Sequence, residues 1–260
     1  MQNAAFRALG RNAVYVAFDV PPDRLGEALR GLHAAGALGL NLTSPLKEAA
    51  WPFLCGATEE ADRSRAVNAL RREPSGWLGH ATDGLGLVTW VRSLGIEVRD
   101  ARVLFLGAGG AARSIAPMLV SLEPEALGIV SRDEARSRSI AVWLREGAAS
   151  RTKVISASLG EPTEGERGGP WDLMIRALAS GSIEPQEAQW WTTLRPGAPV
   201  LELNYGSRAR ESRSRAAADG RRFEDGLGLL LYQGALSFEF WTGERAPLDA
   251  MREALGAASV

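Results

Sequence analysis

The sequence has little of the chemistry that stabilises secreted or metal-dependent proteins. Its 260 residues include one cysteine, Cys55, and two histidines, His33 and His80. A single cysteine excludes a disulfide framework within the chain, and so few cysteines and histidines provide no cluster with metal-ligand spacing. We therefore expect no metal site.

An excess of charge of one sign is also missing. The chain has 30 Lys and Arg residues against 31 Asp and Glu, which leaves a net charge of -1. This balance indicates neither a nucleic-acid surface nor a polybasic membrane patch. Small neutral or anionic molecules remain candidate ligands.

The sequence lacks an apolar run long enough to span a bilayer and opens without a charged-then-apolar leader. Its most apolar stretch, Asp225–Trp241, is interrupted by glycine and charge, so we expect a buried helix there. We expect a cytoplasmic protein without a membrane partner. Because 45% of its residues are hydrophobic, the chain can bury two modest cores, which indicates two domains.

The sequence does contain a glycine-rich stretch, ARVLFLGAGGAARS, at Ala101–Ser114. The stretch begins with an apolar run that is typical of a buried parallel strand. The small residues that follow permit a tight turn, let a phosphate approach the backbone closely, and let the next helix pack on the strand. The free N–H groups of the new helix would bind the anion. The alternative is that this stretch forms only a tight turn and binds no phosphate. The expected cofactor contacts are Gly107, Gly109, Gly110, Ala111 and Ala112.

The next predicted strand, Leu127–Val130, ends at Ser131 and is followed by Arg132 and Arg136. At this position of a dinucleotide fold an acid selects NAD, whereas arginine accommodates the 2′-phosphate of NADP. Two guanidinium groups favour NADP, with NAD the weaker alternative. Asp133 would repel the phosphate if it pointed inward, but an acid here also stabilises the start of the following helix.

The N-terminal part of the chain alternates predicted strands and helices. Ala13–Val20 and Ala37–Leu42 are typical of strands, and Asp23–Ala35 is typical of a helix. This rhythm predicts a parallel sheet, in which ligands bind beyond the carboxyl ends of the strands. Thr43 and Lys47 follow the second strand and are therefore expected near a ligand.

Two further polar residues follow in this part of the chain. Asn68 lies in the short predicted strand Ala66–Leu70, and a buried amide without a partner would cost about 1 to 3 kcal/mol. Asn68 therefore needs a partner, although a local turn bond would also provide one. Asp83 precedes a predicted helix, Leu85–Ser93, and is most simply a helix cap.

The second half of the chain, Val103–Leu203, contains about five predicted strands with helices between them. This pattern indicates a doubly wound α/β domain. Gly160–Gly169 is charged and glycine-rich, which predicts a surface loop.

Six motifs occur along nearly the whole chain in a fixed order. They are NLTSPLK (41–47), AVNAL (66–70), TDG (82–84), GAGGAARS (107–114), SRDEAR (131–136) and GLGLLLYQGALSFEFWTG (226–243). Together they resemble the shikimate dehydrogenase family. The resemblance implies an α/β substrate domain over residues 1–84, a Rossmann-type NADP domain over 85–224, and C-terminal helices over 225–260 that return to the first domain.

The resemblance also implies an activity: the NADP-dependent reduction of 3-dehydroshikimate to shikimate, or of a closely related cyclohexane polyol acid, by a monomer or homodimer. The partner is then a shikimate-like carboxylic acid. Lys47 and Asp83 would be catalytic. The substrate contacts would be Thr43, Asn68, Tyr205 and Gln233, and Gly226 would lie at the nicotinamide end of the cofactor.

Three departures from the family pattern stand beside these matches. The printed sequence begins where the S-x-S-P-x-x-H-N motif of the family is ending, so the first strand and two carboxylate-binding serines are absent from it. The alternative is therefore a weak or silent paralogue that keeps dinucleotide binding, and we expect poor shikimate oxidation by this chain. Arg176 and Leu178 replace polar residues of an N-A-T motif near the cofactor, and Ala81 replaces the asparagine of N-T-D-G.

The arginine pair generates a test of cofactor selection. Arg132→Ala should weaken NADPH binding by about 1.5 to 3 kcal/mol, because one charge-assisted hydrogen bond to the 2′-phosphate is lost. NADH binding should change little. Titration of both cofactors measures the difference, and equal losses would show that Arg132 does not bind the 2′-phosphate.

Overall fold

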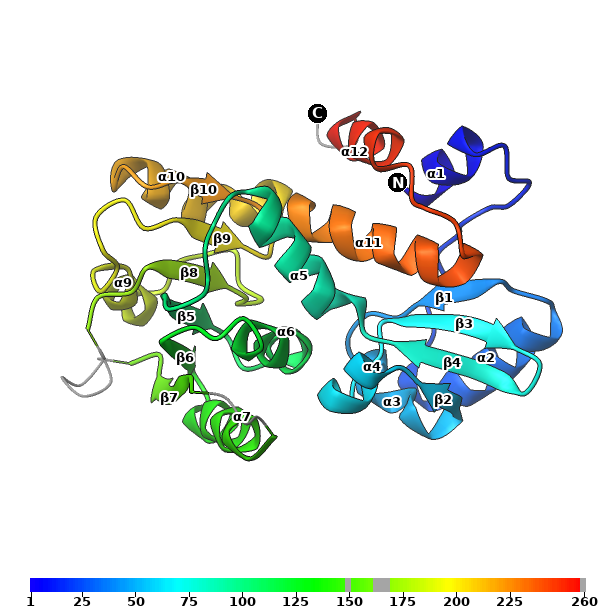
Figure 1. The fold of residues 1–260 in the computed structure, drawn as a ribbon, viewed down its shortest axis with the longest axis horizontal. Coiled ribbons are helices and arrows are strands. Elements are labelled where there is room, and N and C mark those ends of the chain that lie inside the picture. The colour runs from blue at the N-terminus through cyan, green and yellow to red at the C-terminus, as the bar shows by residue number, and fades with distance from the viewer. Residues whose placement is uncertain (148–150, 161–168, 258–260) are drawn as a thin grey trace. The chain divides into compact units, whose positions relative to one another are not determined.

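A computed structural model describes residues 1–147, 151–160 and 169–257 (Figure 1). The chain forms two compact units. The first comprises Met1–Thr89 and Leu230–Val260, and the second comprises Trp90–Leu229. The boundaries between the units fall within two helices, α5 (Thr82–Ser93) and α11 (Leu227–Thr242).

The first unit contains a four-stranded sheet in the order β1-β3-β4-β2. Its strands are β1 (Gly39–Asn41), β2 (Leu54–Ala57), β3 (Ala69–Glu73) and β4 (Gly76–His80). Strand β3 is antiparallel to β1 and β4, and only β2 and β4 are parallel. The predicted parallel sheet is therefore wrong here, because a two-residue turn between β3 and β4 closes an antiparallel hairpin.

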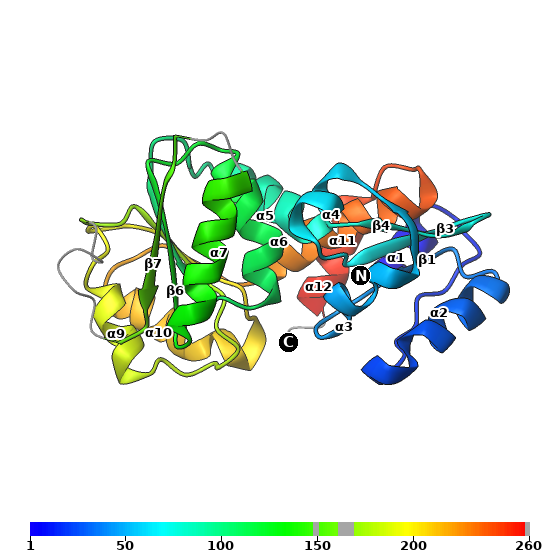
Figure 2. The same ribbon diagram turned by 90° about the horizontal axis from the view of Figure 1, so that it is seen from below.

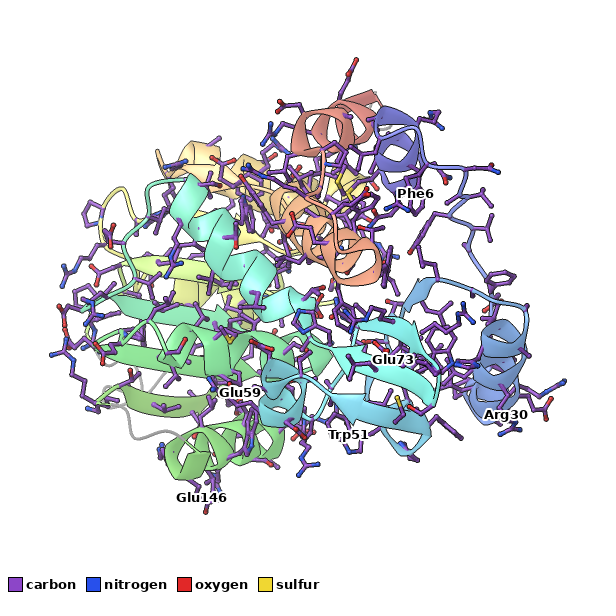
Figure 3. The ribbon with its side chains drawn as sticks, turned by 45° about the vertical axis from the view of Figure 1, so that its right-hand side comes forward. Phe6, Arg30, Trp51, Glu59, Glu73 and Glu146 are labelled. Atoms are coloured by element: carbon purple, nitrogen blue, oxygen red, sulfur yellow. The ribbon has the colours of Figure 1, made fainter. Side chains whose placement is uncertain are left out.

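The first unit also contains short helices, some of which carry buried side chains. They are α1 (Gln2–Ala8), η1 (Pro22–Arg24), α2 (Leu25–Ala34), α3 (Leu46–Ala49), η2 (Trp51–Phe53), α4 (Glu59–Ser64) and α12 (Leu248–Ala257). On α2, Leu25 and Leu29 are buried in the core, and Arg30 points away from it into solvent (Figure 3). The indole of Trp77 on β4 donates to the Leu29 carbonyl at 3.0 Å, which ties helix to sheet.

Helices α1 and α12 form a second core with α11. Phe6, marked in Figure 3, packs its ring 5.3 Å from that of Phe238, and Met251 is fully buried beside them. The Gln2 amide donates to the Gly234 carbonyl at 2.9 Å. These contacts hold the part of α11 that belongs to this unit, and Gln233 lies on the other face of the helix.

The strand predicted at Ala13–Val20 is not formed. Val14, Val16 and Phe18 are 75%, 54% and 61% exposed, and the segment has no strand neighbour. An extended segment becomes a strand only when a neighbour pairs its backbone groups. The Asn3 amide does this at one residue, since it bonds both the N–H and the carbonyl of Tyr15, at 2.6 and 2.9 Å.

The second unit is built on a six-stranded parallel sheet in the order β10-β9-β8-β5-β6-β7. The strands are β5 (Arg102–Leu106), β6 (Ala126–Ser131), β7 (Lys153–Ser158), β8 (Leu173–Arg176), β9 (Val200–Glu202) and β10 (Phe223–Glu224). The order reverses beside β5, so the predicted doubly wound fold is confirmed. Only the two-residue edge strand β10 was not predicted.

Helices cover this sheet, and Figure 2 shows α7 lying along β6 and β7. They are α6 (Gly110–Val120), α7 (Glu134–Gly147), α9 (Pro185–Trp191), η3 (Gly206–Ala209) and α10 (Arg210–Ala218). The core beneath them includes the fully buried Trp171, Trp190 and Trp191. The loop predicted at Gly160–Gly169 lies almost wholly outside the described residues. No helix among the residues that are described is long and apolar enough to cross a membrane.

Candidate active site

Lys47 and Asp83 form an ion pair in the first unit. The Lys47 Nζ donates to Asp83 Oδ2 at 2.6 Å, and the two side chains are 17% and 12% exposed. Lys47 lies on the short helix after β1, and Asp83 lies in the first turn of α5 after β4. Partial burial strengthens the attraction relative to a surface pair while leaving the ammonium accessible to a ligand.

Asn68 has the partners that its burial requires. Its Nδ2 group donates to Asp83 Oδ1 and Thr82 Oγ1, both at 2.8 Å, and lies 3.3 Å from Gln233 Oε1. Its Oδ1 atom accepts from the Thr82 backbone N–H at 2.6 Å. Asn68 therefore connects the start of α5 to α11 and holds the second oxygen of the carboxylate that pairs with Lys47.

A second layer of hydrogen bonds lies behind Asn68. Ser237 on α11 is fully buried, and its hydroxyl donates to the Gln233 carbonyl at 2.9 Å and lies 3.2 Å from the Thr82 hydroxyl. It also accepts from the Asn41 amide at 3.0 Å. The Tyr15 hydroxyl donates to Asn41 Oδ1 at 3.1 Å, and burial raises the pKa of this phenol. The network is continuous from Tyr15 to the Lys47–Asp83 pair.

This arrangement suits the reduction of a carbonyl. An accessible ammonium can stabilise a developing alkoxide and donate a proton to it, while the paired carboxylate fixes its position. The amide of Gln233, which is only partly buried, is of a type suited to bond a hydroxyl group. Among the described residues, no group of three or more His, Cys, Asp or Glu side chains is arranged to hold a metal ion.

The second unit carries the glycine-rich turn between β5 and α6. Gly107 has φ of +128°, and a Cβ there would lie 2.7 Å from the Ala177 carbonyl oxygen. In contrast, a Cβ on Gly109 would meet nothing within 4 Å. No side chain caps α6 at Gly109, so the first N–H groups of the helix face that open space without a side-chain acceptor.

The residues after β6 form a surface cluster. Arg132 lies 3.4 Å from Glu184, and Arg136 lies 3.2 Å from Asp133, with all four side chains at least a third exposed. Exposed pairs of this kind contribute little, so an anionic ligand can displace them. Asp133 Oδ1 accepts from the Arg136 backbone N–H at 3.2 Å, which makes it the helix cap that the alternative interpretation proposed.

Comparison with known proteins assigns the chain to a family. The profile of the shikimate dehydrogenase substrate binding domain matches residues 1–70, and that of the shikimate 5′-dehydrogenase C-terminal domain matches residues 226–255. The shikimate dehydrogenase (NADP(+)) of Moorella thermoacetica is 37% identical over 100% of this chain and 89% of its own length. That of Anaeromyxobacter dehalogenans is 39% identical over 99% and 90%. The chain belongs to the shikimate dehydrogenase family.

Solved structures agree with this assignment. A shikimate dehydrogenase in complex with NADP+ is 29% identical, with a TM-score of 0.84 over 100% of this chain and 90% of the other. The shikimate 5-dehydrogenase of Thermus thermophilus in complex with NADP(H) and shikimate is 27% identical, with a TM-score of 0.81 over 99% and 92%. At the level of the family, the predictions of an oxidoreductase and of NADP are confirmed.

The structure of this shikimate dehydrogenase family member brings together four of the predicted site residues: Lys47, Asp83, Asn68 and Gln233. Thr43 is exposed on the turn before α3. Tyr205 belongs to the second unit, where it is 50% exposed after β9. Gly226 lies at the start of α11, and a Cβ there would lie 2.1 Å from the Leu203 carbonyl oxygen, so only glycine fits.

Arg176 is not the cofactor-facing cation that its alignment with the family motif implied. Its side chain is fully buried and paired with Glu187 and Glu202. Leu178 packs against the core of the second unit. Four network members of the first unit were not among the predicted site residues: Tyr15, Asn41, Thr82 and Ser237. Ser237 had a signal, because it lies four residues after Gln233 on a helix and so shares its face.

Two of the predicted substrate contacts, Asn68 and Thr43, should differ in how much their replacement by alanine changes the stability of the fold. Asn68→Ala should lower the free energy of unfolding by about 1 to 3 kcal/mol, since it strips Thr82 and Asp83 of buried partners. Thr43→Ala, on an exposed turn, should change it by less than about 0.5 kcal/mol. Urea unfolding of both variants provides the comparison. Equal stabilities would contradict the structural role given to Asn68.

Proposed function

We propose that this chain catalyses the NADP-dependent interconversion of 3-dehydroshikimate and shikimate. The observation that carries the proposal is the Lys47–Asp83 pair, at 2.6 Å and braced by Asn68, in a member of the shikimate dehydrogenase family. A paralogue that had kept only dinucleotide binding would have no need of a half-buried ammonium held in this way.

Each residue of the first unit has a role in the proposed reaction. The Lys47 ammonium donates a proton to the carbonyl oxygen as it becomes an alkoxide, and the amine takes the proton back in the oxidation of shikimate. Asp83 holds the ammonium in place, and Asn68 holds Asp83. Thr43, Asn68 and Gln233 bind the polar groups of the substrate, and Tyr205 is a further proposed substrate contact.

The second unit fits a dinucleotide. The open space beside Gly109 and the uncapped start of α6 suit a pyrophosphate. Ser131, Arg132 and Arg136 would hold the adenosine ribose and its 2′-phosphate, and Gly226 would lie at the nicotinamide end. The fully buried Ala112 lets α6 pack on β5. When bound, NADP(H) supplies or accepts the hydride.

The proposed enzyme acts in the cytoplasm on a small carboxylic acid, as a monomer or homodimer, without a nucleic-acid or membrane partner. The near-balanced charge of the chain supports only the proposal that it has no nucleic-acid or polybasic membrane partner. Related folds act on other ketones: a 5-ketofructose reductase of Gluconobacter has a TM-score of 0.83 and 27% identity to this chain. The substrate panel of any assay therefore includes shikimate, quinate and 5-ketofructose.

The sequence offers a matched pair for testing the role of Lys47, because it contains only one other lysine, the exposed Lys153 on β7. Lys47→Ala should lower kcat for shikimate oxidation by about 10² to 10⁴, as expected for a lost acid–base group, with NADP affinity unchanged. Lys153→Ala should leave kcat unchanged. Formation of NADPH followed by absorbance measures both variants.

Two results would count against the proposal. Undiminished turnover by Lys47→Ala would remove this residue from the mechanism. A wild-type protein that binds NADP(H) but neither oxidises shikimate or quinate with NADP+ nor reduces 5-ketofructose with NADPH would favour the silent paralogue.

A further inference from the structure

Arg176, the last residue of β8, makes an unusually complete set of buried contacts. Its Nε and Nη2 atoms donate to the two carboxylate oxygens of Glu187 at 2.7 and 2.9 Å, and Nη1 donates to Glu202 Oε2 at 2.8 Å. Nη1 and Nη2 also donate to the carbonyls of Ser180 and Ser182 at 2.9 and 2.8 Å. All five N–H donors of the guanidinium are therefore used.

The two carboxylates are bound from further elements. The Trp191 indole donates to Glu187 at 3.1 Å, and the Ser212 hydroxyl on α10 donates to Glu202 at 2.8 Å. The remaining oxygen of Glu202 accepts from the backbone N–H and the side-chain amide of Asn204, both at 2.8 Å. Burial alone would lower the pKa of Arg176, but the two carboxylates outweigh it and raise that pKa above its usual value.

Stability alone does not account for such a cluster. Apolar side chains of similar volume often stabilise a core as well as a buried ion pair does, because the charges must be desolvated. An apolar residue would hold no backbone carbonyl, however. Arg176 bonds two carbonyls of the loop after β8 and, through Glu202, the loop after β9. Arginine at this position can therefore fix where these loops lie, whereas an apolar residue cannot.

The loop after β8 lies against the glycine-rich turn, and the loop after β9 lies against the residue that precedes α11. The Ala177 N–H donates to the Leu106 carbonyl at 2.7 Å, and a Cβ on Gly107 would strike the Ala177 carbonyl. The side chain of Asn204 donates to the Leu178 carbonyl at 2.8 Å, and its own carbonyl accepts from the Gly226 N–H at 2.9 Å. Arg176 thus sets the backbone beside two proposed cofactor contacts, Gly107 and Gly226, without reaching them.

The sheet order indicates which part of the dinucleotide these loops would meet. A dinucleotide lies across the point where the strand order reverses, with one half on each side of it. Strand β6, with Arg132 after it, is on one side of β5, and β8 and β9 are on the other. If the adenosine 2′-phosphate lies beyond β6, the nicotinamide half lies beyond β8 and β9.

We propose that Arg176 is a positioning residue for the nicotinamide half of the cofactor, acting through the backbone of residues 177–182 and of Asn204. The inference rests on the proposed function, since it requires a dinucleotide in the second unit. It predicts that loss of the clamp weakens binding of the whole cofactor but not of a fragment that lacks nicotinamide.

The test compares NADPH with adenosine 2′,5′-bisphosphate by calorimetry on the full chain. Arg176→Lys keeps one charge but has three donors in place of five, so the loop carbonyls lose partners. It should raise the Kd of NADPH about tenfold or more and leave that of the bisphosphate within about twofold. Asn204→Ala, which keeps every ion pair of the cluster, should act in the same direction and serves if Arg176→Lys does not fold.

Ser212→Ala is the matched control, because it removes a bond to Glu202 from α10 and none to the loops. It should lower the thermal midpoint with both affinities unchanged. The inference is overturned if Arg176→Lys and Asn204→Ala lose only thermal stability, or weaken both ligands equally. A wild-type chain that binds neither ligand would instead overturn the proposed function, and this inference with it.

Discussion

The first unit depends on one interaction, the contact of Lys47 with Asp83. These residues come from different helices, and a partly buried carboxylate next to a partly buried ammonium requires that each polar atom be bonded. Asn68 donates to the second oxygen of Asp83. Asn68 is in turn bonded to Thr82 and lies beside Gln233, and Ser237 lies next to Thr82. The site is therefore held by side chains that also join α5 to α11.

The second unit uses the same principle for a different purpose. There the bonded charges are fully buried, and they fix two backbone carbonyls in the loop after β8 and the backbone N–H of Asn204 after β9. In both units a polar cluster fixes groups that lie beside proposed ligand contacts. The accessible pair in the first unit can take part in chemistry, whereas the enclosed Arg176 can act only through geometry.

What the sequence predicted well was local. The glycine-rich turn, the strands beside it and the NADP domain follow from apolar runs and small residues that lie within a few positions of one another. Lys47 and Asp83 were brought together by the resemblance to the family and not by any pattern in the chain. The wrong predictions concern which segments or side chains pair with each other. Ala13–Val20 has a strand pattern without a strand neighbour, and β3 and β4 form an antiparallel hairpin. Arg176 is paired with carboxylates on α9 and β9. Composition and periodicity indicate which segments can form strands and which residues can be buried, but they do not reveal which partner each of them finds.

The central claim is that Lys47 and Asp83 act as one unit in catalysis. A double-mutant cycle on kcat tests it directly, with Lys47→Ala, Asp83→Ala and the double variant assayed at saturating shikimate and NADP+. If the carboxylate works by holding the ammonium, the double variant should be about as slow as the slower single variant. Losses that multiply, so that the double variant falls by the product of the two single effects, would show independent roles and contradict the account.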